Sequence, residues 1–289
     1  MLDQARRAAV EVAAAHGVRC GAPAVLWDGS NVLVHLAPAP VVARVATLTA
    51  LVRSDVDTTL AKDVAVAGWL AGQGAPVVPP SGELPAGPHR SSDGRTITFW
   101  THVPHERDHV WRPSEVGPLL ADLHVALRTY PGELPRTPPI EVAAVVDVLR
   151  RLDALGPLTA AEIPDLVADA ARVTEELTGP PVPLHGDAHP GNLMYTRSGP
   201  VWTDFEDAWC GPIGWDLACL ELTRRLDGRA AVAGYPGGAS TCPGDASAPF
   251  LAGRRLAGLV WSLLFRWRFP TPERERDAEA RVRAWRTGL

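Results

Sequence analysis

The sequence predicts an α+β fold with two lobes, a small antiparallel-sheet lobe over residues 1–102 and a mainly helical lobe over residues 103–289. In the first lobe, short runs rich in β-branched and aromatic residues are separated by turn residues such as Asp-Gly and Pro. In the second lobe, apolar residues recur at the spacing of a buried helix face over longer segments. A chain of 289 residues can bury a large core, as one large domain or as two lobes sharing a cleft.

Most elements predicted in the first lobe are strands. The turn Asp-Gly-Ser-Asn at 28–31 separates two apolar runs, so we expect a hairpin there, because Asp-Gly is a common hairpin turn. A third strand follows it, and after that strand small or apolar groups recur at helical spacing. We expect helices at 3–15 and 58–71, and strands at 24–27, 32–36, 41–45, 75–78 and 96–100.

The second lobe is predicted to be built mainly of helices. Thr159 and Glu162 have the spacing of a capping box at the start of one of them. Asp216 is expected to be the N-cap of another, which begins at Leu217. The run 228–248 is rich in Gly, Pro, Ser and Ala and predicts a loop. The remaining helices are expected at 113–129, 140–152, 159–177, 250–267 and 272–285.

Two polar clusters near the middle of the chain are bracketed by short apolar runs. The runs 182–184, 193–195 and 201–202 are too short for helices and predict strands, the last two joined as a hairpin. Asp187 then lies on a tight loop after the first strand, Asn192 at the far end of that loop, and Asp204 at the end of the third strand. We expect these strand ends to bring the three side chains together on a rigid support.

The three side chains offer only oxygen ligands, which suit a hard cation such as Mg²⁺ better than zinc. Phosphoryl transfer requires such a cation on the phosphates, together with a carboxylate that orients the attacking hydroxyl and accepts its proton. An Asp placed five positions before an Asn, with a later Asp-Phe, is the arrangement found in protein kinases.

The stretch His-Gly-Asp-Ala-His-Pro-Gly-Asn at 185–192, with Asp-Phe-Glu at 204–206, resembles the aminoglycoside phosphotransferase and choline kinase family. This family is the small-molecule branch of the protein-kinase-like fold. The resemblance is strong over residues 182–220 and looser over the rest of the chain. It implies a nucleotide-binding lobe at 1–102, a catalytic and substrate lobe at 103–289, and ATP (with GTP as an alternative) and Mg²⁺ as cofactors.

The resemblance also implies a role for each residue of the central motif. Asp187 would accept the proton of the acceptor hydroxyl, and Asn192 and Asp204 would hold Mg²⁺. His185 follows an apolar strand directly and is expected to be a buried, hydrogen-bonded support of the loop. Asp216 would brace the catalytic loop from below.

Two further segments are expected to contact the nucleotide. The turn at 28–31 lies where the family places its phosphate-covering loop, so backbone N–H groups and the Ser30 hydroxyl could contact phosphate oxygens. The exit of the strand at 96–100 resembles the hinge that hydrogen-bonds adenine through backbone groups. The residues assigned to these contacts are Ser30, Asn31, Trp100, His102 and Val103.

Arg44 lies in the middle of a Val-rich strand, where a cation needs a partner. Kinases carry there the Lys that binds the α- and β-phosphates and pairs with a helix acid. The one lysine of this chain, Lys62, lies on the next helix, so we expect Arg44 to take this place, with Asp63 as its partner. A surface charge on an edge strand is the alternative for Arg44. Glu206 is a weaker candidate for a place near the metal.

Composition excludes several classes of partner. A net charge of -5 makes non-specific nucleic-acid binding an unfavourable main task, and no apolar run reaches the length of a membrane span. The four cysteines show no zinc spacing, and no signal peptide is evident, so a cytoplasmic location is expected. A monomer and a homodimer both remain open.

The sequence predicts a small-molecule kinase that phosphorylates a hydroxylated compound. The acceptor stays open among aminoglycosides, other antibiotics, sugars and amino alcohols. The alternative is a catalytically silent kinase-like scaffold that binds nucleotide. Four tryptophans could line an acceptor site or belong to the core: Trp209, Trp215, Trp261 and Trp267.

Overall fold

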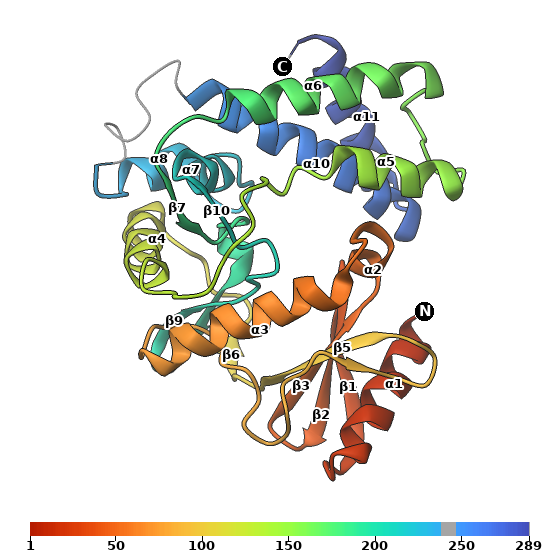
Figure 1. Cartoon of the computed structure of the whole chain (residues 1–289), viewed down its shortest axis with the longest axis vertical. Coiled ribbons are helices and arrows are strands. Elements are labelled where there is room, and N and C mark those ends of the chain that lie inside the picture. Colours follow the sequence, from red (N-terminus) through yellow and green to blue (C-terminus); the bar gives the residue numbers. More distant parts are fainter. Residues whose placement is uncertain (238–246, 289) are drawn as a thin grey trace. The chain divides into compact units, whose positions relative to one another are not determined.

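The computed structural model describes residues 1–237 and 247–288, which fall into two compact units (Figure 1). Unit 1 comprises Met1–Trp111, Leu119–Leu134 and His189–Ala208, and unit 2 comprises Arg112–Pro118, Pro135–Ala188 and Trp209–Leu289. The N-terminal region contains an antiparallel sheet and the C-terminal region is helical, so the predicted α+β class is confirmed. The lobe boundary at residue 102 falls inside unit 1 and stays a prediction.

A five-stranded sheet forms the centre of unit 1. Its strands lie in the order β1-β2-β3-β5-β4, and every neighbouring pair is antiparallel. Their bounds are β1 Cys20–Asp28, β2 Asn31–Pro38, β3 Val41–Ala46, β4 His89–Arg90 and β5 Thr96–Thr101. Arg44 of β3 pairs with Leu33 on one side and with Thr98 on the other. It is therefore not an edge-strand charge, which removes the alternative reading of this residue.

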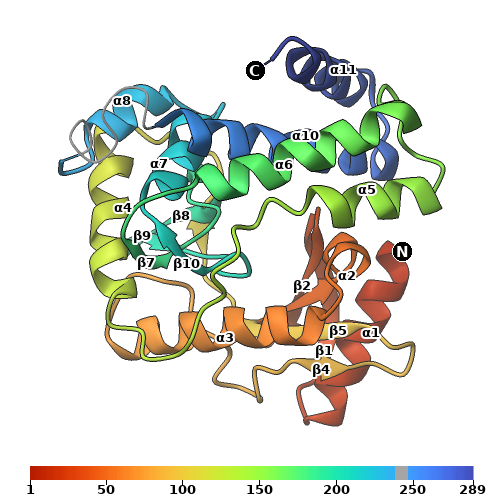
Figure 2. The same ribbon diagram turned by 45° about the horizontal axis from the view of Figure 1, so that its top comes forward.

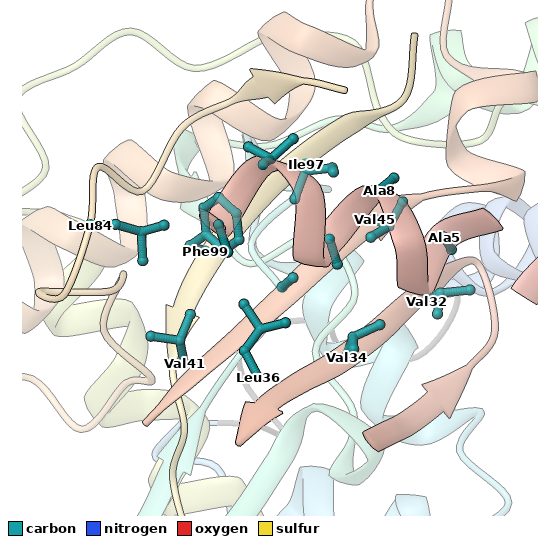
Figure 3. Packing of buried hydrophobic residues seen from close by; sticks show 14 residues of the cluster. Ala5, Ala8, Val32, Val34, Leu36, Val41, Val45, Leu84, Ile97 and Phe99 are labelled. Carbon is teal, nitrogen blue, oxygen red and sulfur yellow. The ribbon is translucent and has the colours of Figure 1, made fainter. Parts of the chain in front are cut away.

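Helix α1 (Leu2–Ala15) covers one face of this sheet, and Figure 3 shows the apolar side chains between them. Its buried positions are mostly alanines such as Ala5 and Ala8, which let the helix lie close to Val32 and Val34 of β2. Ile97 and Phe99 of β5 complete the cluster, and neither is exposed to solvent. Burial of such a continuous apolar layer is the main stabilisation of this part of the molecule.

Two helices follow β3 in the chain, α2 (Leu48–Val52) and α3 (Val56–Gly72). Asp55 is the N-cap of α3, and its carboxylate accepts a hydrogen bond from the Thr58 N–H at 3.0 Å, which satisfies one of the free donors of the first turn. Asp63 lies on its buried face.

Unit 1 also contains a small sheet of β6 (His105–Glu106), β8 (Leu193–Thr196) and β9 (Gly199–Trp202), in which β8 and β9 form the predicted hairpin. The predicted strand at 75–78 is wrong, since only an isolated bridge joins Val77 to Trp202. Pro76 and Pro79 interrupt the donor pattern that a strand ladder needs. Helix α4 (Pro113–Leu127) contributes residues to both units.

In unit 2, strands β7 (Pro181–Leu184) and β10 (Trp209–Pro212) form an antiparallel pair. Helix α10 (Ala248–Arg268) is the centre of the helical part, because four other helices contact it (Figure 2). These are α5 (Val142–Arg151), α6 (Ile163–Glu176), α7 (Gly214–Glu221) and α11 (Pro272–Arg286). Trp209 and Trp215 are 3% and 0% exposed and belong to the core.

Two sequence predictions for this unit need correction. Asp216 is not an N-cap, because α7 already begins at Gly214 and the Asp216 side chain is buried. The predicted loop at 228–248 contains helix α8 (Gly228–Ala233), whose N-cap Asp227 accepts a hydrogen bond from Ala230 N–H at 3.1 Å. Residues 238–246 of that run lie outside the described residues.

No helix among the described residues combines the length and the apolar character that a membrane crossing requires.

Candidate active site

The loop that carries Asp187 is fixed in unit 2 by hydrogen bonds to its backbone. Gly186 has φ +87°, a left-handed conformation that glycine adopts without steric cost. The Asp216 carboxylate accepts from Gly186 N–H at 2.9 Å and from His185 N–H at 2.8 Å, and the Trp215 indole donates to Gly186 O at 2.7 Å. Asp216 therefore braces this loop.

Asp187 follows this braced glycine, and its carboxylate is bound by an arginine of helix α10. The Arg254 guanidinium donates through Nη2 to Asp187 Oδ1 at 2.6 Å, and the two side chains are only 17% and 28% exposed. Arg254 also lies over the ring of Trp215, at 5.3 Å from its centroid. His185 is buried, and its Nδ1 accepts from the Asp187 N–H at 3.3 Å, as expected of a supporting residue. The carboxylate is thus held in one orientation.

Arg254 was not predicted as a site residue, although the sequence carries a weak signal for it. Arg254 lies four residues after Phe250 and three before Ala257, both buried, so helical spacing places it beside the apolar face of α10. A cation in such a position needs a partner. Which carboxylate supplies it, 67 residues earlier in the chain, is not visible in local patterns.

Asn192 and Asp204 belong to unit 1, where the β8–β9 hairpin brings them close together. Asn192 ends a short 3₁₀ turn. Its backbone carbonyl accepts a hydrogen bond at 3.0 Å from the N–H of Thr203, the residue before Asp204. The ring of His189 accepts from Gly191 N–H at 2.9 Å and stabilises that turn. Asp204 has φ +73°, and its side chain is 29% exposed.

Arg44 connects three carboxylates in unit 1 and is 6% exposed. Its Nη1 donates to Asp63 Oδ2 at 2.6 Å, and its Nη2 contacts Asp204 Oδ1 and lies 3.2 Å from Glu206 Oε2. The predicted ion pair with Asp63 is therefore present. Burial alone would lower the pKa of Arg44, but Asp204, Glu206 and Asp63 together raise it well above its ordinary value, so Arg44 stays charged.

The same burial acts in the opposite direction on the acids of this cluster. Burial raises the pKa of Glu206 to about 8 and that of Asp63 to about 6, although the charge of Arg44 opposes both shifts. The Asn31 side-chain amide donates to Glu206 Oε2 at 3.0 Å. Asn31 is 3% exposed, and its Oδ1 has no hydrogen-bond partner among the described residues.

The predicted nucleotide contacts of unit 1 involve backbone groups. Ser30 O accepts from Thr49 N–H at 3.1 Å and from the Thr47 hydroxyl at 3.0 Å, which fixes the turn after β1. At the exit of β5, His102 N–H donates to Pro40 O at 2.8 Å. If this segment binds adenine, the backbone group that donates a hydrogen bond to the base would be Val103 N–H. Among the described residues no backbone carbonyl accepts from this N–H.

The side chains of this hinge are partly or wholly buried. Trp100 is 7% exposed, and its indole donates to the Thr98 hydroxyl at 2.9 Å. The His102 ring stacks on His35 with a centroid distance of 3.8 Å. Burial and the neighbouring His35 lower the pKa of His102. A neutral ring suits this stacked position, and the assignment of the hinge to adenine stays a prediction.

The donor set of unit 1 fits a hard divalent cation that arrives with phosphates. Four acids, Asp63, Asp204, Glu206 and Asp207, lie among three cations, Arg44, Arg53 and Lys62, and with the pKa of Glu206 raised to about 8 the charges of this cluster balance near neutral pH. Asp204 has the most exposed side chain of the four acids. Over the described part of the chain no three His, Cys, Asp or Glu side chains form a metal cage. Mg²⁺ usually takes one or two protein ligands and completes its shell with phosphates and water.

Comparison with solved structures identifies the fold. The chain is similar to a choline/ethanolamine kinase family protein from Mesorhizobium loti (17% identity, 99% and 94% of the two chains covered, TM-score 0.57). It is also similar to the choline kinase LicA from Streptococcus pneumoniae (13%, 94% and 96%, 0.61). A third similar structure is the GDP complex of aminoglycoside 2′-phosphotransferase-IIIa (13%, 95% and 95%, 0.57). The fold is therefore kinase-like, with a sheet-containing N-terminal region and a helical C-terminal region.

The sequence places the chain in a family. Residues 12–250 match the model of the phosphotransferase enzyme family, and the chain belongs to that family. No curated protein matches it significantly. Family membership identifies this chain as a phosphotransferase.

Proposed function

We propose that this protein transfers the γ-phosphoryl group of ATP to a hydroxyl of a small molecule in a Mg²⁺-dependent reaction. The proposal rests on the different surroundings of two acidic side chains, Asp187 and Asp204. Asp187 is held by Arg254 in the braced loop of unit 2, whereas Asp204 belongs to the acidic cluster of unit 1. Phosphoryl transfer requires one carboxylate of each kind, a proton acceptor and a metal ligand.

In this proposal Asp187 orients the acceptor hydroxyl and takes its proton. The contact of Oδ1 with Arg254 fixes the direction of the carboxylate, which a general base needs for a productive geometry. Asn192 and Asp204 hold Mg²⁺, which would neutralise charge on the phosphates. Arg44 would contact the phosphates while it remains paired with Asp63. ATP is the expected donor, and GTP is a second candidate because one similar structure is a GDP complex.

The charge around Asp187 favours an acceptor that carries no positive charge beside the reacting hydroxyl. Arg254 is in direct contact with Asp187. Arg255 follows Arg254 in the chain, and the first half of α10, which carries both, contains no Asp or Glu. Polycationic aminoglycosides need carboxylates in their site, so we propose that sugars and other uncharged hydroxyl compounds are better acceptors.

Calorimetric titration tests the nucleotide and metal parts of this proposal without an acceptor. Wild-type protein should bind ATP more tightly with Mg²⁺ than with EDTA, and parallel titrations with GTP compare the two donors. Asp204→Ala should lose the gain from Mg²⁺ because it removes a metal ligand. The exposed Asp3→Ala is the matched control and should keep that gain. An Asp204→Ala protein with an unchanged Mg²⁺ effect would show that Asp204 is not a ligand.

A further inference from the structure

The segment Asp204-Phe-Glu-Asp-Ala208, called the acidic segment below, has a conformation that must be held by its surroundings. It carries three carboxylates within four positions, and these repel one another. Asp204 has φ +73°, and a left-handed conformation costs an L-residue roughly 1–2 kcal/mol. Contacts from outside the segment must offset both terms if Asp204 is to stay in place.

The first half of the segment is held from β3 and α3. Arg44 contacts the carboxylates of Asp204 and Glu206. Asp63 Oδ1 accepts from Phe205 N–H at 2.8 Å, and the Phe205 side chain is completely buried. Asp63 therefore binds Arg44 with one carboxylate oxygen and the backbone of the acidic segment with the other.

The second half is held by two cations to which the proposed reaction gives no role. Arg53, the residue after α2, contacts the Asp207 carboxylate, and these side chains are 16% and 19% exposed. Lys62 of α3 donates through Nζ to the carbonyl of Ala208 at 2.7 Å. Burial lowers the pKa of Lys62, so its position is unfavourable for a cation unless the contact is made.

We propose that Arg53 and Lys62 are positioning residues that fix the acidic segment from its C-terminal side, so that Asp204 is presented to Mg²⁺. Three cations from three successive elements, β3, the end of α2 and α3, then hold one short segment at both ends. This inference rests on the proposed function, because it assigns the two residues to the metal that the function requires. Groups that orient metal ligands from behind commonly change metal affinity about 10–100-fold when they are removed.

A purely structural role for the two residues makes a different prediction. If they only stabilise unit 1, their loss should weaken ATP binding with and without metal to a similar extent. If they position Asp204, their loss should weaken Mg²⁺·ATP binding and leave metal-free ATP binding unchanged. The informative quantity is therefore the ratio of the two dissociation constants.

The experiment measures this ratio by calorimetry for Arg53→Met and Lys62→Met, which keep an apolar stem of similar length. Each substitution should reduce the gain in ATP affinity that Mg²⁺ produces by about ten-fold, and Lys62→Arg should keep most of that gain. Arg90→Met is the matched control, since Arg90 pairs with Asp57 on the exposed surface of the same unit, with the side chains 55% and 42% exposed. Its ratio should equal that of the wild type.

A second measurement needs no substitution and keeps the test valid if a variant does not fold. Lys62 is the one lysine of the chain, so its acetylation can be followed in the wild-type protein by peptide mass spectrometry. Mg²⁺·ATP should slow acetylation of Lys62 more than ATP with EDTA does, because metal binding orders the segment that Lys62 holds.

Two results would overturn the positioning role. One is an equal loss of ATP affinity with and without metal in the Arg53 and Lys62 variants. The other is a wild-type ratio of the two dissociation constants in these variants, together with Lys62 acetylation that is insensitive to Mg²⁺. Failure of the proposed function has a different signature: the wild-type protein itself would bind ATP no more tightly with Mg²⁺ than with EDTA. That result would overturn both proposals.

Discussion

Arg44 is the residue on which the electrostatics of the candidate site depend most. Its guanidinium presents donors along more than one edge, so it contacts Asp63 through one terminal nitrogen and Asp204 and Glu206 through the other. A lysine has a single charged nitrogen and could not reproduce this forked geometry. The side chain of Asp63 is one carbon shorter than that of a Glu, which leaves room for the larger head group of Arg44.

We expect the Arg44–Asp63 contact to contribute measurable coupling. Arg44→Met and Asp63→Asn should each lower the free energy of unfolding, and a urea double-mutant cycle should give an interaction of about 1–3 kcal/mol, because the pair is buried. ATP affinity should fall more for Arg44→Met than for Asp63→Asn, since only Arg44 is expected to reach the phosphates. Losses that simply add in the cycle would show that the two side chains act independently.

Residues of the central motif could be predicted from sequence because their spacing reflects one local loop and one hairpin. Arg44 and Asp63 were predictable because a strand and the next long helix bring them together. Arg254 and Arg53 were not, since each meets its carboxylate across more than 60 residues of chain. Local patterns show that a buried cation needs a partner, but they do not say which one.

The capping box of the short 3₁₀ helix Ala160–Glu162, which leads into α6, shows how a local sequence pattern fixes an element. Glu162 accepts from the Thr159 N–H at 2.9 Å, as a capping box predicts, and it also accepts from the Thr159 hydroxyl at 2.7 Å. It also accepts from Arg286 of α11, with Nε at 2.6 Å, a contact the sequence did not indicate. The Arg286 hydrogen bond, followed by those of Thr159, lowers the pKa of Glu162 to about 2.

This shift predicts a pH-dependent contribution to stability. A carboxyl group with a folded-state pKa below its unfolded value stabilises the protein fully above the unfolded pKa, and this contribution disappears as the pH falls through the folded value. Glu162→Gln should therefore lower the free energy of unfolding by about 1 kcal/mol near neutral pH. The difference from the wild type should shrink as the pH falls from the unfolded pKa towards about 2.

Urea unfolding of the two proteins across this pH range measures the difference, and Glu175→Gln, at an exposed position of α6, is the control. A difference that stays constant with pH would contradict the assignment of the shift to Glu162.

Element boundaries followed the sequence where the pattern was long and periodic, as in α10 and α11. The predictions were wrong where tertiary contacts determine the conformation. The segment at 75–78 gives its backbone bonds to Trp202, with Val78 N–H donating to Trp202 O at 2.8 Å. Asp is a residue type that is common at N-caps, but the carboxylate of Asp216 accepts hydrogen bonds from the backbone of the Asp187 loop instead.

At the scale of the whole molecule, the two compact units hold different parts of the proposed chemistry. Unit 1 contains the expected nucleotide contacts, Asn192, Asp204 and Arg44, and unit 2 contains Asp187 with its supporting residues. The sequence predicted the fold class and the family. The identity of the acceptor was not predictable, because it depends on side chains from several helices that no short motif brings together.

Transfer of labelled γ-phosphate from ATP to a panel of hydroxylated small molecules would detect the proposed activity itself. The panel should pair neutral sugars with their amino and acidic counterparts. With the wild type and Mg²⁺, we expect a phosphorylated product from at least one neutral acceptor. Asp187→Asn should lower kcat on that acceptor by about 10²–10⁴-fold, because it removes the proton acceptor, while ATP affinity measured in parallel is unchanged. An Asp187→Asn enzyme with a kcat close to that of the wild type, or a wild type that phosphorylates none of the panel, would contradict the account.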